Sequence, residues 1–286
     1  MSTLDPTRYA RVAGRLRGQP ASDGAGVRLT RVIGSQQLPD LDPFLLLDEF
    51  GTDKPEEYLA GFPEHPHRGF ETVTYMLDGR IRHRDNKGNE GVLVPGGVQW
   101  MTAGSGLVHS EMPEQEEGRM RGFQLWVNLP ARDKMTAPRY QEFGPERIPT
   151  ATPADGVSVK VIAGRVGEVE GPVAQPATDP VYLDVVLDAG RDWTHALPEG
   201  HNAFVYVYEG GLSIGEGEDA REVETQHLAV LGGGDVLRLR AGDAATRAIV
   251  VAGRPLREPV ARHGPFVMNT REELMQAFVD FQEGRF

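Results

Sequence analysis

The sequence contains no cysteine among its 286 residues, so disulfide bonds and thiol catalysis are excluded. A structural zinc site is disfavoured for the same reason, because such sites favour thiolate ligands. The absence of cysteine says little about the cellular compartment. Any redox chemistry must therefore come from a bound metal ion or another cofactor.

Basic residues and long apolar segments are also scarce. The chain has 30 lysines and arginines against 42 acidic residues, a formal charge of -12 that opposes direct binding to a phosphate backbone. No segment approaches the roughly 18 consecutive apolar residues of a membrane span. Residues Met1 to Pro20 lack the apolar centre of a secretory signal. We therefore expect a cytoplasmic protein that binds neither membranes nor nucleic acid directly, with a nuclear location open if the source is eukaryotic.

Glycine (35) and proline (21) are abundant and the apolar runs are short, a pattern that predicts an all-β fold with many strands joined by turns. In the first half, the expected strands are Val27–Ile33, Phe44–Leu47, Glu71–Leu77 and Gln124–Asn128. In the second half, they are Val157–Ile162, Val181–Leu187, Ala203–Tyr208, Leu228–Val230, Val236–Leu239 and Ala248–Val251.

One helix is expected near the end of the chain. Thr270 followed by Glu273 fits a capping box, in which each side chain accepts a hydrogen bond from the other residue's backbone. Apolar residues then recur at helical spacing, namely Leu274, Ala277, Phe278 and Phe281. We expect this apolar stripe to pack on a barrel.

The chain reads as two tandem β-barrels. Prolines recur between Pro130 and Asp155 and interrupt regular pairing, which favours an extended connection there. We place a first barrel at residues 1–135, a linker at 136–155 and a second barrel, ending in the helix, at 156–286. A duplication is indicated by segments that recur in the same order: Tyr75–Gly79, Pro95–Gly97 and Ala103–Gly104 against Tyr206–Gly210, Leu231–Gly234 and Ala241–Gly242.

Two pairs of polar side chains in extended contexts predict a metal site. His65 and His67 are two residues apart, as are His109 and Glu111, and residues two apart in a strand point to the same face. Brought together, they offer three imidazoles and one carboxylate to a divalent ion. This donor set suits a redox-capable ion such as ferrous iron.

The predicted site occurs in one barrel. Counting without gaps from the glycines shared by the duplicated segments gives the four matching positions of the second barrel: Ala196, Pro198, Arg247 and Ile249. None of these residues is a metal ligand, so the second barrel is expected to lack a metal site. A gap could still bring His195 and His201 into place, which leaves a second site open.

Longer strings resemble those of the pirin family of bicupins. They are His65–Val73, Gln99–Gly104, His109–Pro113, Leu125–Leu129, Pro255–Pro259 and His263–Thr270. The resemblance extends from about Pro43 to the end of the chain. It implies two antiparallel cupin β-barrels, with one iron in the first barrel held by residues matching His65, His67, His109 and Glu111.

The resemblance also implies two activities. One is oxygen-dependent cleavage of flavonols such as quercetin with release of carbon monoxide, which makes the expected partners a small aromatic substrate and O2. The alternative is an iron-dependent, redox-responsive regulatory protein that binds a transcription factor or a metabolic enzyme. Ferrous iron is the expected cofactor, and manganese, cobalt, nickel, copper and zinc remain alternatives.

Two glutamates compete for the carboxylate role. A generic cupin places its carboxylate shortly after the histidine pair, where Glu71 stands on the face of His67 if the strand is unbroken. Pirins instead resemble this chain in having Glu111 beside His109. We predict that Glu111 is the ligand and the catalytic base that accepts the substrate's hydroxyl proton, with Glu71 orienting an imidazole.

The residues around the predicted site also have expected positions or roles. The strand after the first histidine pair is expected to supply an apolar cavity wall through Val73, Tyr75 and Leu77. Arg68 is either a cation at the cavity mouth or an ordinary salt bridge. Trp100 and Met101 are expected in the core or at its rim, and His83, before a hairpin turn, is expected in solvent.

Overall fold

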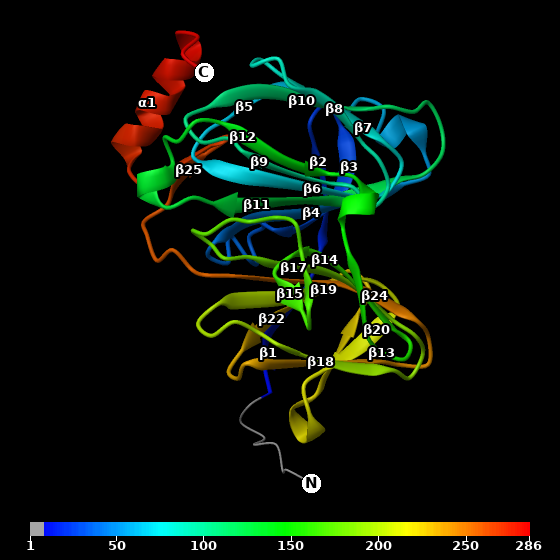
Figure 1. Cartoon of the computed structure of the whole chain (residues 1–286). Coiled ribbons are helices and arrows are strands. Elements are labelled where there is room, and N and C mark those ends of the chain that lie inside the picture. The colour runs from blue at the N-terminus through cyan, green and yellow to red at the C-terminus, as the bar shows by residue number, and fades with distance from the viewer. Residues whose placement is uncertain (1–8) are drawn as a thin grey trace. The chain divides into compact units, whose positions relative to one another are not determined.

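The computed structural model describes residues 9–286, which form two compact units built mostly of antiparallel strands (Figure 1). The first barrel comprises Gln19–Arg147 and Leu256–Phe286, and the second comprises Ile148–Pro255 together with residues 9–18. No helix in the described part of the chain is long and apolar enough to cross a membrane.

The first barrel consists of two sheets. Its seven-stranded sheet has the order β12 (Arg139–Phe143), β9 (Val98–Thr102), β6 (Phe70–Asp78), β11 (Met120–Asn128), β4 (Phe44–Thr52), β3 (Val27–Ile33) and β2 (Gln19–Asp23). Its four-stranded sheet has the order β5 (Phe62–His67), β10 (Leu107–Pro113), β7 (Ile81–Asp85) and β8 (Glu90–Leu93).

The second barrel repeats this plan. Its seven-stranded sheet has the order β1 (Arg11–Arg17), β22 (His227–Gly232), β19 (Asn202–Glu209), β24 (Thr246–Gly253), β17 (Val181–Leu187), β14 (Val157–Ala163) and β13 (Thr150–Ala154). Its four-stranded sheet has the order β18 (Asp192–Ala196), β23 (Val236–Ala241), β20 (Gly211–Ile214) and β21 (Arg221–Glu224). The matching strand orders confirm the predicted all-β fold of two cupin barrels.

Smaller elements complete the two units. Two short hairpins are β15 (Arg165–Val166) with β16 (Val169–Glu170) and β25 (Ala261–His263) with β26 (Phe266–Met268). The single-turn helices are η2 (Pro55–Glu57), η3 (Ala131–Asp133), η4 (Pro145–Arg147) and η5 (Gly217–Asp219). The one α-helix of the described chain is α1 (Arg271–Gln282).

The predicted helix is confirmed, with Thr270 as its N-cap. The Thr270 side chain accepts a hydrogen bond from the Glu273 backbone, and the Glu273 carboxylate accepts one from the Thr270 backbone. Ala277 is fully buried, and the Phe278 ring lies edge-on to Phe266 of β26, 4.9 Å between centroids. The apolar stripe therefore packs on the β25–β26 hairpin of the first barrel.

The two ends of the chain depart from the predicted division. Residues 9–18 belong to the second barrel, because β1 pairs with β22 at the edge of its sheet. The segment from Leu256 onward belongs to the first barrel rather than the second. Two contacts hold it there: the Leu256 and Arg257 backbones donate to the Asp42 carboxylate, and the Lys134 ammonium donates to the Val267 carbonyl.

Half of the segment predicted as a linker, 136–155, is strand. β12 joins the first barrel and β13 joins the second. Pro153 is accommodated in β13 because this strand lies at a sheet edge, where its register with β14 shifts between Ala151 and Ala154. Proline therefore marks irregular edge strands here rather than an unpaired connection.

Candidate metal centre

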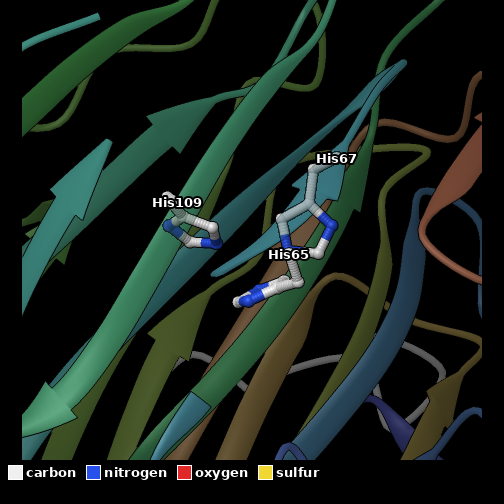
Figure 2. Close-up of side chains that lie close together, drawn as sticks. All are labelled: His65, His67 and His109. Carbon is white, nitrogen blue, oxygen red and sulfur yellow. The ribbon is translucent and has the colours of Figure 1, made fainter. Parts of the chain in front are cut away.

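Three histidines from two neighbouring strands come together inside the first barrel. His109 of β10 lies directly opposite His65 of β5, so both side chains point to the same face, which His67 shares by alternation. The ring centroids are 4.4 Å apart for His65 and His109, 4.7 Å for His65 and His67, and 5.0 Å for His67 and His109 (Figure 2). Each ring contributes one nitrogen to a group whose members lie within 4.8 Å of one another.

The protonation state of these rings suits metal binding, which requires neutral imidazole. Burial, followed by the neighbouring histidines, lowers the pKa of His67 well below its ordinary value. Burial, followed by His65 and His83, has the same effect on the pKa of His109. Two of the three rings are therefore neutral near pH 7.

The hydrogen bonding of the rings also fits a metal. Both ring nitrogens of His109 are buried and have no hydrogen-bond partner within the described chain. Such orphaned groups are rare in folded proteins and are satisfied by an ion or water. His65 Nδ1 lies 2.8 Å from the Pro63 carbonyl oxygen, which can only accept. This contact places the proton on Nδ1 and leaves Nε2 free to bind a cation.

Glu111 follows His109 on the same face of β10 and lines the same cavity. Its carboxylate oxygens do not belong to the group of potential ligand atoms that lie within 4.8 Å of one another, which the three histidines alone form. Its carboxylate accepts hydrogen bonds from Thr74 Oγ1 at 3.0 Å and Gln124 Nε2 at 3.4 Å. Burial raises the pKa of Glu111, against the opposing effects of His65 and the Thr74 hydroxyl. The role of Glu111 as fourth ligand stays a prediction.

Glu71 occupies a different environment. The expected continuous strand is broken between β5 and β6, where Gly69 has a φ of 87°. A Cβ at Gly69 would lie 2.0 Å from the Val267 carbonyl oxygen, so this close approach requires glycine. Beyond the break, Glu71 lies opposite Thr102 and accepts its hydroxyl hydrogen at 2.6 Å. Glu71 does not line the cavity.

His65 and His67 line a cavity of about 680 Å³, which is large enough for a small aromatic molecule. Its apolar wall consists of Leu29, Leu46, Phe50, Phe62, Ile81 and Trp126. The prediction that Val73, Tyr75 and Leu77 form the wall is wrong, because β6 turns Thr74 toward the cavity. Val73 and Tyr75 are fully buried on the other face of that strand.

Burial decides the predictions for four neighbouring residues. His83 is buried rather than in solvent; it lies opposite Glu111 in the β7–β10 register, and its Nε2 is 2.7 Å from the Glu142 carboxylate. Arg68 is also buried and forms an ion pair with Asp280 at 2.6 Å, which confirms its interpretation as a salt bridge. Trp100 and Met101 lie in the core as expected.

Strand register gives the positions of the second barrel that correspond to the site. β7 follows Gly79 and β20 follows Gly210, so Ile81 and His83 of β7 correspond to Leu212 and Ile214 of β20. The residues that pair with Leu212 and Ile214 on β23 therefore correspond to Pro113 and Glu111 on β10. In the second barrel, Leu197 therefore stands in the place of His67, Leu237 in that of His109 and Leu239 in that of Glu111. His195, which pairs with Leu237, stands in the place of His65.

This alignment corrects the gap-free count, which shifted the comparison onto other residues. The second barrel has lost three of the four predicted ligands rather than all four. Within residues 9–286, the three histidines of the first barrel are the one group of three or more potential ligands that lie close enough together to hold a metal ion. His195 instead stacks on Trp193, with 5.1 Å between ring centroids.

Two cupin barrels, one of which carries a triad of histidines facing a cavity, define a bicupin with a single candidate metal centre. The chain belongs to the pirin family: the Pirin model matches residues 26–127, and the model of the Pirin C-terminal cupin domain matches residues 182–286.

Similar proteins are found in bacteria and animals. A pirin-like protein of Caulobacter vibrioides is 56% identical over 272 residues, covering 95% of this chain and 97% of the relative. Pirin of Mus musculus is 47% identical over 266 residues, covering 92% of this chain and 89% of the relative. A crystal structure of quercetin 2,3-dioxygenase from Acinetobacter baumannii has a TM-score of 0.89 and 34% identity, covering 97% of this chain and 98% of that one.

Proposed function

We propose that the protein is a metal-dependent dioxygenase that cleaves flavonols such as quercetin with O2 and releases carbon monoxide. The observation that carries this proposal is the triad of His65, His67 and His109 beside a cavity of about 680 Å³ with apolar walls. The structural similarity to quercetin 2,3-dioxygenase from Acinetobacter baumannii supports the same substrate class.

We further propose ferrous iron as the metal, held by the three histidines with Glu111 as the fourth ligand. Three imidazoles and a carboxylate leave a divalent ion with open positions, and a chain without cysteine offers no thiolate to select zinc. When bound, such an ion supplies Lewis acidity toward the adjacent hydroxyl and carbonyl of a flavonol, together with redox exchange with O2.

The protein's own residues have separate tasks in this proposal. Glu111 accepts the proton of the flavonol hydroxyl; its raised pKa makes the carboxylate a better base than an exposed glutamate. Thr74 and Gln124 fix the carboxylate in position by hydrogen bonding. The apolar wall excludes water from the substrate, which limits side reactions of an electron-rich enolate.

A combined metal and turnover measurement tests this function. Freshly purified protein is analysed for its metal content and is then supplied aerobically with quercetin, while oxygen consumption and carbon monoxide are recorded. We expect about one iron per chain and equal consumption of oxygen and quercetin. Iron-loaded protein that binds a protein partner differently in its ferrous and ferric states, without consuming quercetin, would instead support the regulatory role.

A further inference from the structure

The cavity has a second polar region, formed by Arg31, Asp48 and Arg262. Arg31 donates from Nε and Nη2 to the two Asp48 carboxylate oxygens at 2.9 and 2.8 Å, and from Nη2 to Asp23 at 2.7 Å. The hydrogen bond to Asp48 is the largest cause that raises the pKa of Arg31 above its ordinary value. Two carboxylates therefore already neutralise Arg31, which leaves it little capacity to bind a ligand.

Arg262 is placed differently. Its Nη1 donates to the Leu45 carbonyl oxygen at 2.8 Å, and its guanidinium carbon lies 4.9 Å from the centroid of the Trp126 ring. No carboxylate in the described chain forms an ion pair with it, and Leu45 is the one described acceptor of its hydrogen bonds. Because a guanidinium carries five N–H donors and stays charged at neutral pH, most of its donors remain available to a ligand.

The position of Arg262 relates it to the metal centre. The Trp126 ring neighbours both Arg262 and the metal centre, since its centroid also lies 5.3 Å from that of His67. Arg262 and His67 line one cavity, and the Arg262 guanidinium carbon lies no farther from the His67 ring centroid than the sum of these two distances. An aromatic molecule of two or three fused or linked rings is long enough to reach from one to the other, with the apolar wall along its rings.

We propose that Arg262 is a specificity-determining residue that binds a ring hydroxyl, or the phenolate formed from it, on the part of the substrate remote from the metal. This inference rests on the proposed function, since it takes a flavonol to be the molecule bound in the cavity. The guanidinium offers charge-assisted hydrogen bonds to such an oxygen, and its stacking on Trp126 fixes its direction. The residue selects among flavonols and takes no part in the reaction.

Two ligands separate this role from general support of the cavity. Quercetin carries ring hydroxyls remote from its hydroxyl–carbonyl pair, whereas 3-hydroxyflavone carries that pair alone. Binding of each is titrated anaerobically on iron-loaded protein, so that no turnover intervenes. We expect Arg262→Gln to weaken quercetin binding about tenfold, the effect of losing one hydrogen bond to a charged group, and to change 3-hydroxyflavone binding less than about twofold.

Two further variants define the controls. Arg262→Lys keeps the charge but loses the planar fork, so it should restore part of the preference for quercetin. Arg271→Gln removes an exposed arginine of the same barrel that does not line the cavity, and should bind both ligands as the wild type does. Iron content and melting temperature establish that each variant is folded and loaded.

The outcomes are distinguishable. An equal loss for both ligands in Arg262→Gln would show that the residue supports the wall or Trp126, and unchanged affinities for both would show that it contacts neither ligand; either result overturns the inference. Oxygen consumption by the wild type is measured on the same preparations. Absence of turnover with a lost preference for quercetin would contradict the proposed function alone, whereas normal turnover with an unchanged preference would contradict the role of Arg262 alone.

Discussion

The two barrels share one strand order but differ in what fills the space between their sheets. In the second barrel, a continuous apolar cluster includes Trp193, Leu237 and Leu239. In the first, the corresponding space contains His65, His109 and Glu111 and remains partly open as a cavity. A shared scaffold thus carries either a packed core or a polar site, depending on a few positions that face inward.

His195 shows how little of a site survives the loss of its other members. It lies where His65 lies in the first barrel, but leucines occupy the three remaining positions. Burial lowers the pKa of His195 to about 4, as it lowers the pKa of His67 and His109. Desolvation alone therefore keeps an imidazole neutral, whereas metal binding needs several donors at one point.

We expect the largest effect from His109→Leu, which gives the first barrel the leucine that the second barrel has at the corresponding position. Loss of one of three imidazoles should reduce iron affinity by at least about a hundredfold and abolish quercetin turnover. Without metal, the variant should be more stable than the wild type by about 1 to 2 kcal/mol, because a leucine replaces two unsatisfied buried nitrogens. Iron analysis and urea unfolding with a chelator measure the two effects.

His227→Leu serves as the control for this variant, since His227 is a partly exposed residue of the second barrel. It should keep the iron content of the wild type. Full iron occupancy in His109→Leu would mean that the triad does not hold the metal, and the contrast between the barrels would lose its functional meaning.

The next largest effect should distinguish the roles of the two glutamates in metal binding. Glu111→Gln keeps the shape that Thr74 and Gln124 contact but removes the charge, so iron affinity and turnover should fall about 10- to 100-fold. Glu71→Gln should retain its iron, because Glu71 contacts Thr102 outside the cavity. Iron content after dialysis against a weak chelator compares the variants. Metal loss confined to Glu71→Gln would show that the ligand is Glu71.

The sequence predicts individual strands and the two pairs of candidate ligands because both depend on local alternation. Spacing alone places His65 with His67 and His109 with Glu111, and the predicted strands Val27–Ile33 and Val181–Leu187 match the observed bounds. Long-range register is not contained in spacing. The gap-free count missed the correspondence of Leu237 with His109 because its starting points are not equivalent: Ala103–Gly104 precedes β10, whereas Ala241–Gly242 lies at the end of β23.

Other features depend on contacts between distant segments. Arg262 lies far along the chain from Arg31 and Trp126, and it reaches the cavity because the segment after Leu256 packs on the first barrel. The burial of His83 arises from β12, which supplies Glu142. A side chain on a hairpin strand can thus be covered by a later strand of the other sheet, which spacing does not reveal.

A smaller effect concerns His195 in the second barrel. Its folded pKa of about 4 lies below the ordinary 6.5, so between these values the unfolded chain binds a proton that the folded chain does not. The free energy of unfolding should therefore fall as the pH is lowered from about 6.5 to 4. His195→Leu should remove on the order of 2 kcal/mol of this dependence. Hydrogen exchange of β23 amides in urea at pH 7 and pH 4 measures this change in the free energy of unfolding. An equal change between the two pH values in the wild type and in His195→Leu would contradict the role of His195.

The smallest expected effect tests how the C-terminal helix α1 is attached to the first barrel. Asp280 of α1 accepts hydrogen bonds from Arg68, which follows His67, and from Gln276, and these contacts help hold the pKa of Asp280 below its ordinary value. A depressed carboxyl pKa stabilises the fold above the ordinary pKa of 3.8, and this stabilisation is lost as the pH falls through the folded value. Asp280→Asn should lower the melting temperature by about 3 °C at pH 7, and the difference from the wild type should shrink below about pH 3. Asp243→Asn, an exposed change in the second barrel, should show neither effect. A difference for Asp280→Asn that persists undiminished at low pH would mean that packing, rather than the ion pair with Arg68, attaches this helix to the strand that carries the first two histidines.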